Sequence, residues 1–270
     1  MFSPILKIGP LALHWYGLFV AAAIWLAIIW SERRAKRRGL PADFVWDAAF
    51  WVVFGGLIGG RLYHVLNFWS YYQGSLWEVF FVWRGGLGIY GALVGGWLAF
   101  ALLWFVNRRN PRSGPRLDFF RWLDVVSPAL LLGQAVGRIG NFFNYELYGW
   151  PTTSFLGMYV PPQYRLWSVA PFSTFHPLFL YESVWCLVGL GILLEVERRW
   201  QARLIDGALF FLYLLLYAGG RFYLEGLRIE SWTIGGWRVA QAISGAVFLA
   251  AIGCLLIKRG AFLRKGLTRP

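Results

Sequence analysis

The chain of 270 residues is 58% hydrophobic, 20% aromatic and only 14% charged. So few charged side chains cannot cover the surface of a soluble domain, which favours a protein with several membrane-spanning segments. The net charge of +13 does not indicate a nucleic-acid-binding protein, because the basic residues stand in short clusters between apolar runs.

Seven apolar runs are long enough to cross a bilayer core of about 30 Å, which takes roughly 20 helical residues. They predict an all-α polytopic membrane protein with a single membrane domain. The expected spans are 11–30, 44–66, 86–106, 119–143, 177–196, 208–225 and 238–257. Basic clusters follow alternate spans, at 32–38, 108–121, 198–203 and 258–269. Because Lys and Arg concentrate in cytoplasmic loops, we expect the N-terminus outside and the C-terminus in the cytoplasm.

The first span has Lys7 before it, positive residues after it and no small-residue cleavage motif, so we expect a retained anchor. Tyr16 stands at its outer end, between Trp15 and Gly17. Trp and Tyr favour the membrane interface, so Tyr16 is interpreted either as an interfacial anchor or as a site residue.

The second span ends with Gly59-Gly60-Arg61-Leu62-Tyr63-His64, and the segment after it is rich in aromatic residues. With hardly any charge, residues 67–85 are expected to form an arm in the headgroup layer, which guides lipids or simply anchors the protein. His64 is interpreted as structural. The third span opens with glycines around Tyr90, whose spacing permits close helix packing.

The fourth span carries the pattern around which the chain is organised, Gly137-Arg138-Ile139-Gly140-Asn141 continuing to Gly149. The polar side chains of this stretch are Arg138, Asn141, Asn144 and Glu146. Charges at membrane depth are costly, so each needs a partner or a function. Arg138 lies about 18 residues from the inner face, or about 27 Å along a helix, which places it near the outer edge of the hydrocarbon.

Residues 144–176 are expected to form a small extracytoplasmic cap, too short for a separate domain. The fifth span begins His176-Pro177-Leu178-Phe179-Leu180-Tyr181-Glu182, and His176 and Glu182 are interpreted as pairing with neighbours. Near the end of the sixth span, Arg221 and Glu225 are four residues apart on one helical face and are expected to form an ion pair. Cys186 and Cys254 have no neighbouring cation in the sequence, which predicts unreactive thiols.

Arg61, Arg138 and Arg221 each stand near a glycine, and each is expected near the outer end of its span. Three guanidiniums at one depth predict a cluster that holds phosphate, and the outer leaflet offers anionic phospholipid. A lipid-binding enzyme and a lipid or solute transporter both fit such a cluster. The expected position near the outer interface, and no convincing duplication of two halves, count against transport.

Five motifs in order resemble those of the bacterial prolipoprotein diacylglyceryl transferases. They are Trp15-Tyr16-Gly17, the glycines around Tyr90, the stretch 137–149, His176-Pro177 to Glu182, and Arg221 to Arg228. The resemblance implies transfer of a diacylglyceryl group from phosphatidylglycerol to the lipobox cysteine of a prolipoprotein signal peptide, the first step of lipoprotein maturation. It implies a multi-pass protein of the bacterial cytoplasmic membrane, with its active site towards the outer leaflet. We expect no metal or other cofactor, and a monomer.

The resemblance also implies roles for individual residues. The expected catalytic residues are Tyr16, Arg138, Glu146, Arg221 and Glu225, and the expected substrate-binding residues are Tyr90, Arg138, Asn141, Asn144 and Gly149. Arg61 joins the expected substrate-binding residues because of its expected depth beside Arg138 and Arg221, not because of the resemblance. Many family members carry a histidine where this chain has Tyr90. An imidazole base from that position is therefore unavailable, and the base that takes the thiol proton is unassigned.

Overall fold

The computed structural model describes residues 5–8, 11–82, 85–107 and 119–267. Most of the expected basic cluster at 108–121, and part of the one at 258–269, lie outside these ranges. The chain forms two compact units, one of Met1–Ile29 with Leu123–Pro270 and the other of Trp30–Trp122.

Among the described residues, seven helices are long and apolar enough to cross a membrane, which confirms the all-α polytopic prediction. They are α1 (Trp15–Arg37), α2 (Asp43–Asn67), α4 (Ile89–Asn107), α5 (Phe119–Phe143), α6 (Leu178–Trp200), α7 (Ala208–Glu225) and α8 (Val239–Leu267). The prediction started the first helix too early, because Leu11–His14 pairs as β2 with β1 (Ile5–Ile8). The first and last helices also extend beyond their apolar runs, since hydropathy does not mark where a helix ends.

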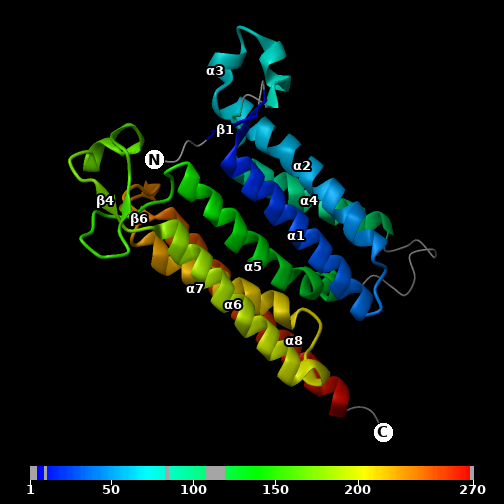
Figure 1. Cartoon of the computed structure of the whole chain (residues 1–270). Coiled ribbons are helices and arrows are strands. Elements are labelled where there is room, and N and C mark those ends of the chain that lie inside the picture. Colours follow the sequence, from blue (N-terminus) through cyan, green and yellow to red (C-terminus); the bar gives the residue numbers. More distant parts are fainter. Residues whose placement is uncertain (1–4, 9–10, 83–84, 108–118, 268–270) are drawn as a thin grey trace. The chain divides into compact units, whose positions relative to one another are not determined.

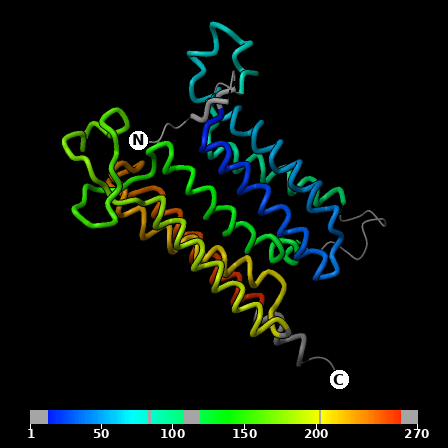
Figure 2. The backbone as a smooth tube through the Cα atoms, in the orientation of Figure 1, coloured from blue at the N-terminus to red at the C-terminus, as the bar shows by residue number. Residues whose placement is uncertain are grey.

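In the unit Trp30–Trp122, α2 and α4 lie side by side (Figure 2). Their closest backbone contacts are at glycines. A Cβ atom on Gly59 would lie 2.3 Å from the Gly91 carbonyl oxygen, and one on Gly95 would lie 2.2 Å from the Gly55 carbonyl oxygen. These positions pair in reverse order, so the two helices are antiparallel. Backbones can approach this closely only where side chains are absent. Between the helices, the expected arm contains α3 (Trp69–Tyr72) and η1 (Leu76–Phe80).

In the other unit, α6, α7 and α8 lie side by side (Figure 1). The start of α1 packs along α5, where the rings of Trp15 and Phe143 stack with centroids 5.3 Å apart. The Asp124 carboxylate accepts hydrogen bonds from the backbone N–H groups of Gly207 and Phe210, at 2.7 and 2.9 Å. This caps the first turn of α7 and ties it to α5.

The segment of residues 144–176, which was predicted to be a cap, follows α5. It contains β3 (Met158–Tyr159), β4 (Thr174–Phe175), η4 (Pro162–Tyr164) and η5 (Trp167–Val169). A hydrophobic core of its own includes Tyr148, Val160 and Phe175. The buried Tyr148 hydroxyl donates to the Tyr164 carbonyl and accepts from the Leu166 N–H, at 2.9 and 2.7 Å. The remaining short elements are η6 (Gln201–Arg203) and the hairpin of β5 (Thr233–Ile234) and β6 (Trp237–Arg238).

Candidate active site

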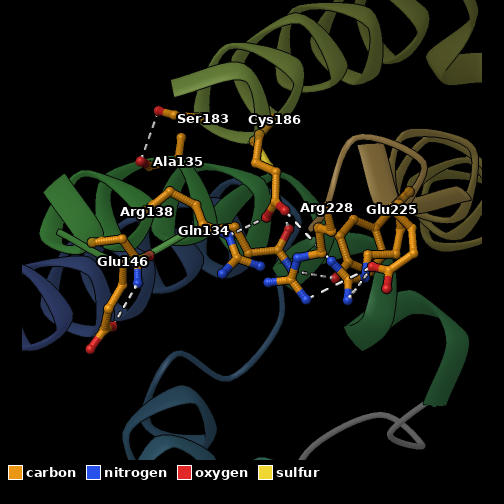
Figure 3. Close-up of polar contacts among 12 residues, drawn as sticks. Gln134, Ala135, Arg138, Glu146, Ser183, Cys186, Glu225 and Arg228 are labelled. Carbon is orange, nitrogen blue, oxygen red and sulfur yellow. Dashed lines mark hydrogen bonds and ion pairs between the residues drawn. The ribbon is translucent and has the colours of Figure 1, made fainter. Parts of the chain in front are cut away.

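Five charged side chains from α5, α6, α7 and the turn after α7 form a row of alternating sign, here called the charge row (Figure 3). Arg138 Nε lies 2.6 Å from Glu182 Oε2, and Arg221 Nη1 lies 3.6 Å from Glu182 Oε1. Arg221 Nη2 lies 2.8 Å from Glu225 Oε2, and Arg228 Nη1 lies 3.8 Å from the same oxygen. The expected pair of Arg221 and Glu225 is confirmed, and it extends on both sides.

The two carboxylates are the most deeply buried members of the row. Glu182 is 8% exposed and Glu225 is 2% exposed, whereas the side chains of Arg138 and Arg228 are 32% and 30% exposed. Buried carboxylates are tolerated because each lies between two guanidiniums. The row therefore offers its positive ends, rather than its negative members, to an approaching molecule.

Glu182 and Arg228 belong to the charge row but not to the predicted set of site residues. Glu182 has the more central place. It joins α5 to α7, because its two carboxylate oxygens pair with arginines from both helices. Sequence spacing reveals ion pairs within one helix, and this pair crosses between helices. The signal that could have found it is the scarcity of acidic residues near the outer ends of the predicted spans.

A cavity of about 20 Å³ borders the charge row and is lined in part by Gln134, Arg138, Glu182, Cys186 and Arg221. Gln134 donates a hydrogen bond of 2.9 Å from its amide to the Tyr213 hydroxyl, and the Cys186 thiol lies 3.9 Å from the Gln134 amide oxygen. Cys186 thus lines the same cavity as Arg138 and Arg221. The sequence showed no cation near Cys186, but the fold brings two arginines close to it, so that part of the prediction is wrong. The helical repeat brings Cys186 one turn from Glu182.

Asn141, Asn144 and Glu146 form a second cluster, which Figure 3 shows at Glu146, apart from the row between Arg138 and Arg228. The amide nitrogens of Asn141 and Asn144 each lie 3.4 Å from one Glu146 carboxylate oxygen. The residues on either side, Tyr145 and Leu147, have φ angles of 55° and 57°. Residues with a Cβ rarely adopt this left-handed backbone, so the surrounding structure must hold it. The consequence is a fixed backbone on both sides of Glu146, whose side chain is exposed.

Gly149 lies where three of the predicted motifs meet. Its N–H donates to the His176 carbonyl oxygen at 2.8 Å, and it forms an isolated β-bridge with Arg228. A Cβ atom here would stand 2.7 Å from the Leu227 carbonyl oxygen. Gly149 is therefore required for close approach of two backbones. His176 also fits its structural interpretation, because its Nδ1 lies 3.1 Å from the Tyr181 hydroxyl.

Tyr16 is half-exposed on α1 and packs beside α5. A Cβ atom on Gly140 would lie 3.1 Å from Tyr16 Cδ2, so the glycine between Arg138 and Asn141 makes room for this ring. Tyr16 is thus held next to the stretch 137–149.

Arg61 and Tyr90 belong to the other unit. The buried Arg61 guanidinium donates from Nε to the Val79 carbonyl at 2.8 Å and from Nη1 to the Gly85 carbonyl at 2.8 Å, and it also donates to the Glu78 carbonyl. It clamps the arm to α2. Tyr90 is exposed on α4, with its ring 6.0 Å from that of Tyr63.

Comparison with known proteins identifies the family. The model of the prolipoprotein diacylglyceryl transferase family matches residues 4–257. The chain belongs to this family. A phosphatidylglycerol–prolipoprotein diacylglyceryl transferase of Symbiobacterium thermophilum is 42% identical over 96% of this chain and 92% of its own length. Those of Trichormus variabilis and Halalkalibacterium halodurans are 41% and 38% identical, over 90% and 93% of this chain and 84% and 83% of their own lengths. The resemblance drawn from the five motifs is confirmed.

Proposed function

We propose that this member of the diacylglyceryl transferase family transfers the diacylglyceryl group of phosphatidylglycerol to the lipobox cysteine thiol of a prolipoprotein. The observation that carries the proposal is the charge row, because guanidiniums held at fixed positions match the phosphate that must bind and leave. Membership of the family supplies the reaction.

In the proposed reaction the thiol sulfur attacks the glyceryl carbon that is bonded to phosphate. The carbon–sulfur bond forms, the carbon–oxygen bond breaks, and the electron pair stays on the phosphate oxygen of the departing glycerol phosphate. Arg138 and Arg221 hold that phosphate and stabilise its growing charge, which is the kind of electrostatic term that often dominates catalysis. Glu182 and Glu225 fix the two guanidiniums. Asn141 and Asn144 donate hydrogen bonds to headgroup oxygens, Glu146 positions these two amides, and Tyr16 hydrogen-bonds the lipid or the incoming thiol.

The thiol proton needs an acceptor, since this chain has Tyr90 where an imidazole is usual in the family. The candidates are water, a carboxylate and the released phosphate. A phosphate monoester has a second pKa near 6, above the reference value of about 4.3 for a glutamate side chain. The released phosphate is thus the stronger base, so we place the proton there. Tyr90→Phe should accordingly retain full activity.

We place the site towards the outer leaflet of the bacterial cytoplasmic membrane, with the N-terminus outside and the C-terminus in the cytoplasm. The alternation of basic clusters supports this topology. A monomer suffices for the proposed site, because the whole charge row comes from one unit of one chain. We further propose that Arg61 and Tyr90 contact lipid at the arm and the start of α4.

The decisive assay combines the purified protein in detergent with phosphatidylglycerol and a lipobox peptide, and follows the mass of the peptide. We expect a gain of one diacylglyceryl group that disappears with Arg138→Ala and with a peptide whose cysteine is replaced by serine. Near-normal turnover by Arg138→Ala at saturating lipid would refute the assigned role. A folded, lipid-binding protein that never modifies the peptide would point to transport instead.

A further inference from the structure

Arg228 lies at one end of the charge row and was not among the predicted site residues. It follows α7 in a turn, in which its N–H donates to the Glu225 carbonyl oxygen at 3.3 Å. Within the described part of the chain, its guanidinium has one ion-pair partner, Glu225, at 3.8 Å. Arg221, by contrast, has a carboxylate on each side. Most of the five N–H donors of Arg228 are therefore not used by Glu225.

The charge of Arg228 is incompletely compensated. Burial, and then the nearby guanidinium of Arg221, hold the pKa of Arg228 below its ordinary value, although Glu182 and Glu225 act in the opposite direction. Three guanidiniums and two carboxylates leave the charge row with one excess positive charge. A phosphodiester carries one negative charge, so a single lipid phosphate would neutralise the row.

Gly149 determines where Arg228 can lie. The backbone around Gly149 is hydrogen-bonded on one side to His176 and on the other to Leu227, whose carbonyl accepts from the Trp150 N–H at 3.3 Å. Gly149 does not have a positive φ angle, so the backbone conformation does not require glycine here. The position requires glycine because a side chain would collide with neighbouring atoms. An alanine Cβ would meet the Leu227 carbonyl oxygen at 2.7 Å and Leu178 Cγ at 3.1 Å. The neighbouring backbone, and with it Arg228, would have to move away.

We propose that Arg228 is a third phosphate-binding residue of the site, and that Gly149 acts by positioning it. The ligand is a monoanionic phosphodiester headgroup, so the inference rests on the proposed function. Arg228 and Arg138, at the two ends of the row, bind the phosphate from opposite sides, while Arg221 lies between them. The competing explanation is that Arg228 only complements the negative end of the α7 dipole.

The test measures two constants for wild type, Arg228→Gln, Arg228→Lys, Gly149→Ala and the double variant Gly149→Ala/Arg228→Gln. One is KM for phosphatidylglycerol, and the other is the inhibition constant of glycerol phosphate, which reports phosphate binding directly. Gly191→Ala serves as the control, because a Cβ atom on Gly191 would meet nothing within 4 Å. Thermal unfolding of each variant reports stability separately.

Loss of a charge-assisted hydrogen bond predicts that Arg228→Gln raises both constants by roughly 10- to 100-fold. Arg228→Lys should raise both constants less than Arg228→Gln does, because lysine keeps the positive charge but lacks the planar guanidinium with its several donors. Gly149→Ala should raise both constants in the same direction, and the double variant should be no worse than Arg228→Gln, since both changes remove one contact. Gly191→Ala should match wild type.

An unchanged inhibition constant in Arg228→Gln, with altered thermal stability, would overturn the assignment in favour of the dipole explanation. Effects that multiply in the double variant would show that Gly149 acts separately from Arg228. A Gly149→Ala protein that does not fold would likewise overturn the positioning role, and the Arg228 variants would still decide the first half. Wild-type protein without any transfer would instead refute the proposed function.

Discussion

Replacing Glu182 by glutamine tests whether one carboxylate holds α5 and α7 together. Glu182 is 8% exposed and pairs with Arg138 and Arg221. Breaking a buried ion pair by removing one partner costs about 3–5 kcal/mol. We expect the lower end, about 3 kcal/mol, because Arg138 is partly exposed and Arg221 keeps Glu225. At about 2–4 °C per kcal/mol for a chain near this size, Tm should fall by about 6–12 °C.

The assay is thermal unfolding of the purified protein in one detergent, with two comparison variants. Glu182→Gln/Arg138→Gln should regain most of the lost stability, because it no longer leaves a guanidinium without its carboxylate. Glu195→Gln, on the exposed part of the same helix, breaks pairs with Arg198 and Arg199 and should not measurably change Tm. A Glu182→Gln shift below about 2 °C, or a double variant less stable than the single one, would refute the reasoning.

Three further changes address other parts of the molecule. Arg61→Gln should release the arm from α2, because the guanidinium no longer donates to the arm's carbonyl groups. Backbone amides of residues 76–82 should then exchange hydrogen faster. Unchanged exchange would mean that these contacts do not hold the arm in place. Gly91→Val should lower Tm by about 6 °C or more, because overpacking costs about 3 kcal/mol. The new Cβ atom would lie 2.2 Å from the Gly59 carbonyl oxygen. Gly191→Ala, which meets nothing within 4 Å, is the comparison and should leave Tm unchanged. Burial raises the pKa of Tyr148, so its contribution to stability is complete below the unfolded value near 10 and falls at higher pH. Tm measured from pH 8 to 11 should therefore decline less steeply in Tyr148→Phe, and parallel curves would contradict this.

Hydropathy and motif spacing predicted the seven helices and the meeting of Arg138 with Arg221, because burial of apolar runs and scarcity of charge are properties of the sequence itself. The role of Glu182 as the shared partner could not be read from spacing, since it depends on which faces of α5, α6 and α7 meet. The same applies to Arg228, which joins the row from the turn after α7, where its backbone forms an isolated bridge with Gly149.

Local backbone geometry was also not predicted from the sequence. Tyr145 and Leu147 adopt left-handed backbone although neither residue type favours it. Packing of the cap, in which Tyr145 is part of the core, overrides that preference. The predicted grouping of Arg61 by depth was based on the expected direction of each span. Within its own unit, the donors of Arg61 are engaged by carbonyl groups of the arm, which spacing in the sequence does not indicate.

The glycine contact between α2 and α4 has a consequence for the order in which the protein is made. Both helices lie within residues 43–107, and the backbone contacts that join them are internal to this segment. The pair can therefore assemble as soon as α4 has entered the bilayer, before the ribosome has reached Arg138. Short sequence separation also favours early formation. Substitutions in the charge row should thus leave this helical pair correctly built even when the later half of the chain fails.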